Sequence, residues 1–293
     1  MSVASLPVAP GRQSEAWRGA VLVLLSAVAF SAAGFFTRLI DADAWTMLFW
    51  RGLFGGLFIA GYVWCRDGAD AFTTLRRIGR LGLLAAACSA VATICFINAL
   101  RQTTVADVLV INATAPFVAA AIAWAWTGER ERRSTFVASS VALLGVVVMV
   151  VDAAGSGRWL GNLLAVVMTV LISAMMVVIR RQRAVCMLPA ASLSAFLCAL
   201  LAWPLAEPAS VSGDDFGYLI LFGTLQFGLG LLLLTLGTRL ISATRSALIG
   251  ALETPLAPAL VWLAFGEVPS LMACIGGLIV LGAVVADLLV VKE

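Results

Sequence analysis

Apolar residues fill most of this chain in long runs that short polar stretches separate. Most runs contain about 20 residues, the length that an α-helix needs to cross the hydrocarbon core of a bilayer. The pattern therefore predicts an all-α membrane protein with ten transmembrane helices. The runs lie near residues 17–37, 45–65, 81–100, 104–126, 135–151, 159–179, 188–205, 216–238, 243–265 and 270–290.

The composition supports this prediction, because 62% of the residues are hydrophobic, 12% are charged and the mean hydropathy is +1.05. A soluble domain cannot bury so much apolar surface. The loops are too short for an ATP-binding module, which argues against a primary pump. Residues 1–15 are expected to form a flexible cytoplasmic tail. The first run has no small-residue cleavage pattern and another run follows it at once, so it is expected to be a retained helix rather than a signal peptide.

Basic residues are distributed unevenly between alternate loops. If the N-terminus is inside, fifteen of the 19 Lys and Arg residues lie on the inner side, three lie on the outer side, and Arg51 lies within a run. The positive-inside rule then places both termini in the cytoplasm. The expected location is a bacterial inner membrane. The net charge of +3 thus reflects topology and does not indicate binding to nucleic acid.

The two halves of the sequence resemble each other at a nearly constant offset. Five runs make up each half, and an odd number means that the second half enters the membrane from the opposite side. We therefore predict two inverted five-helix repeats, residues 16–152 and 153–293, around a pseudo-two-fold axis in the membrane plane, an arrangement typical of secondary transporters. Trp17, Gly19, Ser31, Ala32 and Arg38 recur 142 positions later, and Trp124, Gly128 and Glu129 recur 138 positions later.

Two segments also resemble a known family. Residues 105–150, with Pro116, Trp124-Ala125-Trp126, Gly128-Glu129-Arg130 and Gly145, are similar to the EamA-type module of the drug/metabolite transporter superfamily. Residues 242–285 resemble a second copy through Pro255, Trp262, Gly266-Glu267 and Gly282. The resemblance implies a ten-helix exporter of small molecules. Its cargo would commonly be amino acids and small metabolites, with drugs and sugar phosphates as other cargoes of the superfamily.

Two charged residues within the runs are the main candidates for substrate binding. Glu253 lies near the bilayer midplane, where a charge costs about 2.5–3.5 kcal/mol and must face a cavity or a partner. It can receive a substrate ammonium, hold a proton in an exchange cycle, or link helices as a protonated carboxyl group. Arg51, about two turns below the outer surface, can meet a substrate carboxylate, pair structurally or extend to the surface. Arg245 is expected to extend to the cytoplasm.

Prolines within the fourth and ninth runs are candidate hinges. Pro116, Pro255 and Pro258 lack an N–H group, so the carbonyl groups of Asn112, Ala251 and Thr254 are expected to lose their helical partners. Such carbonyl groups can line a cavity, or neighbouring helices can satisfy them at a simple kink. Further candidates for substrate binding, with interhelical contacts as the alternative role, are Asn112, Ser31, Ser173, Gln226, Phe30 and Phe227.

These features favour a secondary transporter that exports amino acids, with neutral and aromatic ones preferred. Cationic drugs attracted by Glu253 are the alternative, whereas sugar phosphates need several buried cations and Arg51 is the one clearly intramembrane cation. An intramembrane enzyme is disfavoured because the chain has no histidine and no HExxH motif. Six cysteines without a CxxC pair give no reason to expect a metal or other cofactor. Polar residues are too sparse to line a channel.

Overall fold

The computed structural model describes residues 10–103, 105–128, 131–150, 159–266, 268 and 270–290, and all regular elements in this part of the chain are helices. Nine described segments are long and apolar enough to cross a membrane, one fewer than the sequence predicts. They are Ser14–Leu39, Ala44–Asp67, Gly79–Ala99, Val108–Trp126, Trp159–Arg181, Leu188–Leu205, Gly213–Thr238, Ala243–Phe265 and Leu271–Leu289.

Several of these segments consist of more than one helix. The first segment comprises α2 and most of α1. Helix α1 already begins at Pro10, so residues 10–15 are helical although the sequence suggests a flexible tail, and residues 1–9 lie outside the described part. The α-helices are α1 (Pro10–Ser31), α2 (Ala33–Leu39), α3 (Ala44–Asp67), α4 (Ala71–Arg77), α5 (Gly79–Gln102), α6 (Val105–Asn112), α7 (Ala115–Thr127), α8 (Arg133–Val150), α9 (Trp159–Arg181), α10 (Leu188–Ala202), α11 (Gly213–Leu221), α12 (Gly230–Thr238), α13 (Ala243–Gly250), α14 (Glu253–Phe265) and α15 (Leu271–Val290). Short 3₁₀ helices are η1 (Gly68–Asp70), η2 (Trp203–Leu205) and η3 (Pro208–Ser210), and η4 (Phe222–Leu229) is a π-helix.

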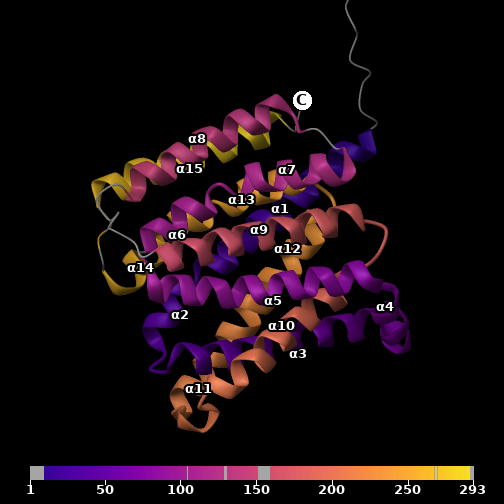
Figure 1. Cartoon of the computed structure of the whole chain (residues 1–293), viewed down its shortest axis with the longest axis vertical. Coiled ribbons are helices and arrows are strands. Elements are labelled where there is room, and N and C mark those ends of the chain that lie inside the picture. Colours follow the sequence, from indigo (N-terminus) through magenta and orange to yellow (C-terminus); the bar gives the residue numbers. More distant parts are fainter. Residues whose placement is uncertain are drawn as a thin grey trace, which may run out of the picture.

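The fifth predicted span corresponds to α8, whose apolar part is shorter than the other nine segments. Its 18 residues extend about 27 Å, and it packs along α15 at one edge of the bundle (Figure 1). Gly145 of α8 meets Gly276 of α15, and Thr135 of α8 bonds to Asp287 near the end of α15. The two helices are therefore antiparallel and extend over the same depth.

The fourth and ninth spans are interrupted at equivalent places. In the fourth span, α6 ends at Asn112 and α7 runs from Ala115 to Thr127. In the ninth span, α13 ends at Gly250 and α14 runs from Glu253 to Phe265, so each boundary is repeated 138 residues later. Each second helix ends at a left-handed glycine, with φ of 70° at Gly128 and 72° at Gly266, a conformation that glycine adopts without strain. The two interrupted spans thus have the same local design.

Helices of the first half pack mainly against helices of the second half: α3 against α10, α5 against α9, α1 against α12, α7 against α13 and α8 against α15. Small residues permit the close approach of the backbones, as in other membrane helices. A Cβ atom added at Gly52 of α3 would lie 2.7 Å from the carbonyl oxygen of Ala195 in α10. The core is therefore built between the halves, and the site described below lies where they meet.

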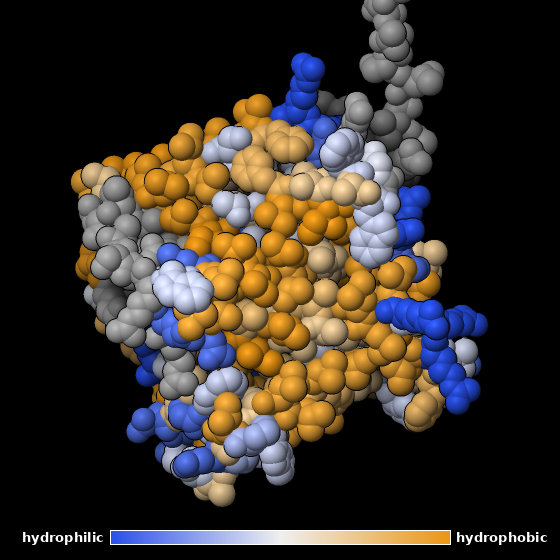
Figure 2. Space-filling view, viewed as in Figure 1, coloured by the Kyte–Doolittle hydropathy of each residue, from blue (hydrophilic) through white to orange (hydrophobic). Residues whose placement is uncertain are grey.

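The exterior of the bundle is apolar along the flanks of its helices. Figure 2 shows hydrophobic residues across the middle of one face and hydrophilic residues gathered toward the ends of the helices. Large apolar side chains such as Leu144, Leu200, Leu263 and Leu278 are each at least 63% exposed. A surface of this kind is stable when it contacts lipid chains, which agrees with the prediction of a membrane protein.

Candidate functional site

Arg51 of α3 is the centre of a polar cluster within the bundle. Its Nε atom donates a hydrogen bond to Gln226 Oε1 at 3.2 Å. Its guanidinium carbon lies 4.3 Å from the ring centroid of Phe227 and 5.2 Å from that of Phe222. Both distances allow the cation to be attracted by the aromatic rings. Arg51 is thus held by one amide and two rings rather than by an ion pair.

Gln226 connects this cluster to the first span. Its Nε2 atom donates a hydrogen bond to the carbonyl oxygen of Phe30 at 3.1 Å, and its side chain is only 2% exposed. Four residues that the sequence suggests for substrate binding, Arg51, Gln226, Phe30 and Phe227, therefore lie together although they come from three different spans. Phe222 also belongs to the cluster around Arg51, but the sequence does not predict it. Nothing in an apolar run indicates the local helix geometry that places this ring beside Arg51.

Glu253 is the second charged residue at this site and the first residue of α14. A carboxylate at a helix N-terminus is favoured by the helix dipole, which gives a local reason for its position after the break. Glu253 interacts electrostatically with Arg51. Among the described contacts, however, no ion pair within 4.0 Å joins the two side chains. Both are partly accessible, and they interact electrostatically without a direct ion pair among the described contacts.

The remaining polar candidates lie outside this cluster or are already bonded. The Ser31 hydroxyl donates to Val28 O of its own helix at 2.6 Å, and the Ser173 hydroxyl donates to Ala115 O of α7 at 3.2 Å. Both serine side chains are fully buried. Asn112 ends α6 and is partly accessible. Ser173 and Asn112 thus lie at or near the break of the fourth span rather than in the cluster around Arg51.

The candidate hinge prolines lie just after the breaks. Pro116 is in the first turn of α7 and Pro255 is the third residue of α14, positions where the absent N–H would have no partner within the helix. The carbonyl oxygen of Ala251 accepts a hydrogen bond from Thr254 N at 3.1 Å, so the expectation that Pro255 frees this group is wrong. Pro258 lies inside α14 without interrupting it.

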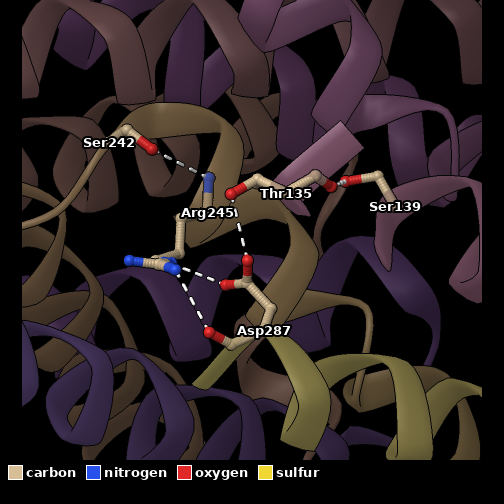
Figure 3. Close-up of polar contacts among 5 residues, drawn as sticks. All are labelled: Thr135, Ser139, Ser242, Arg245 and Asp287. Carbon is tan, nitrogen blue, oxygen red and sulfur yellow. Dashed lines mark hydrogen bonds and ion pairs between the residues drawn. The ribbon is translucent and has the colours of Figure 1, made fainter. Parts of the chain in front are cut away.

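A second polar network lies between α8, α13 and α15 (Figure 3). Arg245 Nε donates to Asp287 Oδ2 at 2.6 Å, and Arg245 Nη2 donates to Asp287 O at 3.2 Å. The Thr135 hydroxyl donates to the other carboxylate oxygen at 3.0 Å. The Asp287 side chain is fully buried and that of Arg245 is 11% exposed. This network corrects the expectation that Arg245 extends to the cytoplasm.

The sequence does contain a signal for this network. Asp287 is an acidic residue within the last apolar run, and a carboxylate at such a position needs a partner. Arg245 is near the start of the ninth run, but nothing in the sequence indicates that α13 and α15 are neighbours. Packing of the helices supplies that information.

The comparison with known families decides what kind of protein this is. The sequence model of the EamA-like transporter family matches residues 17–151 and again residues 159–286. The chain belongs to the EamA-like transporter family. Membership indicates a membrane transporter of small molecules, and it confirms the resemblance to this family in both halves of the sequence. The two matches together cover nearly all of the described part of this EamA-like chain.

A solved structure supports the fold of this EamA-like transporter. A protein of known crystal structure superimposes with a TM-score of 0.80 over 94% of this chain and 99% of the other chain. The sequences are 17% identical, so this likeness concerns the fold alone. A search of curated proteins finds no significant match.

Removal of one partner from the buried Arg245–Asp287 pair is expected to destabilise the protein. Asp287→Ala leaves a buried cation without a partner, which costs about 3–5 kcal/mol. The double variant Arg245→Met/Asp287→Leu removes both charges and should recover most of that loss. Thermal unfolding of the purified protein in detergent, followed by fluorescence, measures both effects.

The ion pair between Arg66 and Asp67 provides a matched control. It has the same N–O distance of 2.6 Å, but its side chains are 36% and 16% exposed. Asp67→Ala should therefore lower stability much less than Asp287→Ala does, because solvent screens an exposed ion pair. An equal loss of stability in Asp67→Ala and Asp287→Ala would contradict the role of burial.

Proposed function

We propose that the protein is a secondary carrier that exports amino acids, neutral and aromatic ones preferred, by alternating access. The pair of Arg51 and Glu253 carries the proposal, because these partly accessible residues interact electrostatically and no described ion pair joins them. A free amino acid carries a carboxylate and an ammonium group at neutral pH. The planar guanidinium of Arg51 suits a carboxylate, and the carboxylate of Glu253 can accept hydrogen bonds from an ammonium group.

The surroundings of the two charges favour an apolar or aromatic side chain on the substrate. Phe222 and Phe227 lie over the Arg51 guanidinium, and Phe30 contributes its carbonyl group to the same cluster. Burial of an apolar ring against such residues contributes about 25 cal/mol per Å². A substrate with few charges beyond its zwitterionic head would therefore bind best.

The charges also weigh against the alternative cargoes. A cationic drug would be attracted by Glu253 but repelled by Arg51, since both act on the same region. A sugar phosphate calls for several cations, and Arg245, the charged partner of Asp287, is already neutralised. Export of cationic drugs remains the alternative that the experiment below tests.

We further propose that residues 16–152 and 153–293 form two inverted repeats and that α8 completes ten crossings. The antiparallel packing of corresponding helices supports this topology. In one pair, Gly52 of α3 approaches Ala199 of α10 while Gly56 accepts a hydrogen bond from Ser192. The pair of α8 and α15 is antiparallel as well. Equivalent helices of opposite direction are what an inverted repeat requires.

Alternating access would use the interrupted spans. The proposal assigns the hinge role to the breaks at residues 113–114 and 251–252, next to Pro116 and Pro255, with Pro258 allowing α14 to bend. Because Glu253 starts α14, a swing of this helix would change the distance between Glu253 and Arg51. Movement at the break at residues 251–252 would therefore depend on whether substrate is bound to Glu253 and Arg51.

Both termini are proposed to lie in the cytoplasm, with the protein in a bacterial inner membrane. Gly19 near the start of α1 packs on Leu240, and Asp287 near the end of α15 bonds to Arg245, so both ends lie beside the turn between α12 and α13. The excess of basic residues assigns this side to the cytoplasm. Reporter fusions at residue 293 should be active only with a cytoplasmic reporter, and a periplasmic signal would contradict the assignment.

The substrate assignment predicts how analogues compete for transport in proteoliposomes. Phenylalanine should inhibit uptake of labelled phenylalanine about tenfold to a hundredfold more strongly than phenethylamine, which lacks the carboxylate, or hydrocinnamate, which lacks the ammonium group. Each analogue leaves one buried charge of the site without its partner. Equal or stronger inhibition by phenethylamine would favour the cationic-drug alternative, and absence of any amino-acid transport would overturn the proposal.

A further inference from the structure

Both ends of the Gln226 amide are occupied by the protein itself. Its oxygen accepts from Arg51 Nε at 3.2 Å, its nitrogen donates to Phe30 O at 3.1 Å, and the side chain is 2% exposed. We infer that Gln226 is a positioning residue that orients Arg51 toward the substrate and does not itself touch the substrate. This inference rests on the proposed function, and it replaces the direct binding role that the sequence suggests for Gln226.

The hydrogen bond determines which edge of the guanidinium is free. A guanidinium can bind a carboxylate through Nε and one terminal nitrogen, or through its two terminal nitrogens. Gln226 occupies Nε, and among the described contacts the two terminal nitrogens of Arg51 make no hydrogen bond. Arg51 is partly accessible. The end of the guanidinium that carries the two terminal nitrogens is therefore the edge left for a carboxylate.

The π-helix η4 explains how one segment supplies three contacts to Arg51. Gln226 follows Phe222 by four residues, and Phe227 follows Phe222 by five residues. In an α-helix of 3.6 residues per turn, Phe222 and Phe227 would point about 140° apart. The i to i+5 repeat of a π-helix brings them to one face beside Gln226, and such insertions occur frequently at functional sites. The rings and the amide can then hold the guanidinium together.

Glycines allow η4 to approach α3 closely enough for these contacts. A Cβ atom added at Gly223 would lie 2.5 Å from Phe54 Cβ and 3.1 Å from Arg51 O. One added at Gly55 of α3 would lie 2.7 Å from Phe227 Cδ1. The backbones of α3 and η4 are therefore in direct contact beside Arg51. This contact brings the Gln226 side chain within hydrogen-bond distance of Arg51 Nε.

The test compares inhibition by phenylalanine and by phenethylamine in proteoliposomes that contain each variant. Gln226→Ala should lower the preference for phenylalanine over phenethylamine by about tenfold, since a misplaced Arg51 no longer recognises the carboxylate. Inhibition by phenethylamine itself should change little. In an Arg51→Gln background, Gln226→Ala should have no further effect on the preference, because its role acts through Arg51.

Controls separate positioning from a general structural role. Thr224 lies in the same π-helix, and among the described contacts its hydroxyl bonds to Ile220 O of the same span, so Thr224→Val should keep the full preference. If Gln226→Ala does not reach the membrane, Gln226→Met preserves side-chain length and carries the same test. A preference that persists in the Gln226 variants would overturn the inference. So would an additional loss in the Arg51→Gln background, which would indicate direct contact with the substrate.

The same measurements distinguish the failure of the inference from that of the proposed function. If the wild-type protein does not prefer phenylalanine over phenethylamine, the zwitterion site is wrong and the inference fails with it. If the wild-type protein shows the preference and Arg51→Gln abolishes it, the function stands. The Gln226 variants then test the positioning role of Gln226 independently of the proposed function.

Discussion

A charge within a bilayer must be neutralised, hydrated or bound to something, and this constraint organises the structure. Two arrangements satisfy it in different ways. Arg245 and Asp287 are bonded directly, with Thr135 on the remaining carboxylate oxygen, so they form a closed pair between α13 and α15. Arg51 and Glu253 interact electrostatically, and no described ion pair joins them. The closed pair is suited to holding helices together. Arg51 and Glu253, which are not bonded to each other, are suited to binding a zwitterion, a molecule that carries one positive and one negative group.

The backbone obeys the same constraint at the interrupted spans. Carbonyl groups at the breaks need partners, and Ile111 O and Ala251 O have them from Thr114 N and Thr254 N. The breaks are thus stable in this conformation while they interrupt the continuous ladder of helical hydrogen bonds. Glu253 directly follows one break, which places the charge proposed to hold substrate beside the proposed hinge.

The sequence predicts the helical runs and the family because both depend on local pattern and spacing. It also selects Arg51, Glu253 and Gln226, since charged and polar residues in apolar runs are conspicuous. It does not reveal the Arg245–Asp287 pair, which requires that α13 and α15 be neighbours. Nor does it reveal the π-helix around Gln226, because a residue inserted into a helix leaves no mark in a uniformly apolar segment. The carbonyl group of Ala251 was misjudged because the helix restarts before Pro255.

The most direct test of this account is equilibrium binding of labelled phenylalanine to the purified protein. The account predicts that Arg51→Gln and Glu253→Gln each weaken binding by about tenfold or more, since each removes one charge-assisted interaction. The double variant Arg245→Met/Asp287→Leu should bind phenylalanine as the wild-type protein does, because the closed pair does not face the site. Wild-type affinity in Glu253→Gln, or loss of binding only in the Arg245/Asp287 variant, would contradict the account.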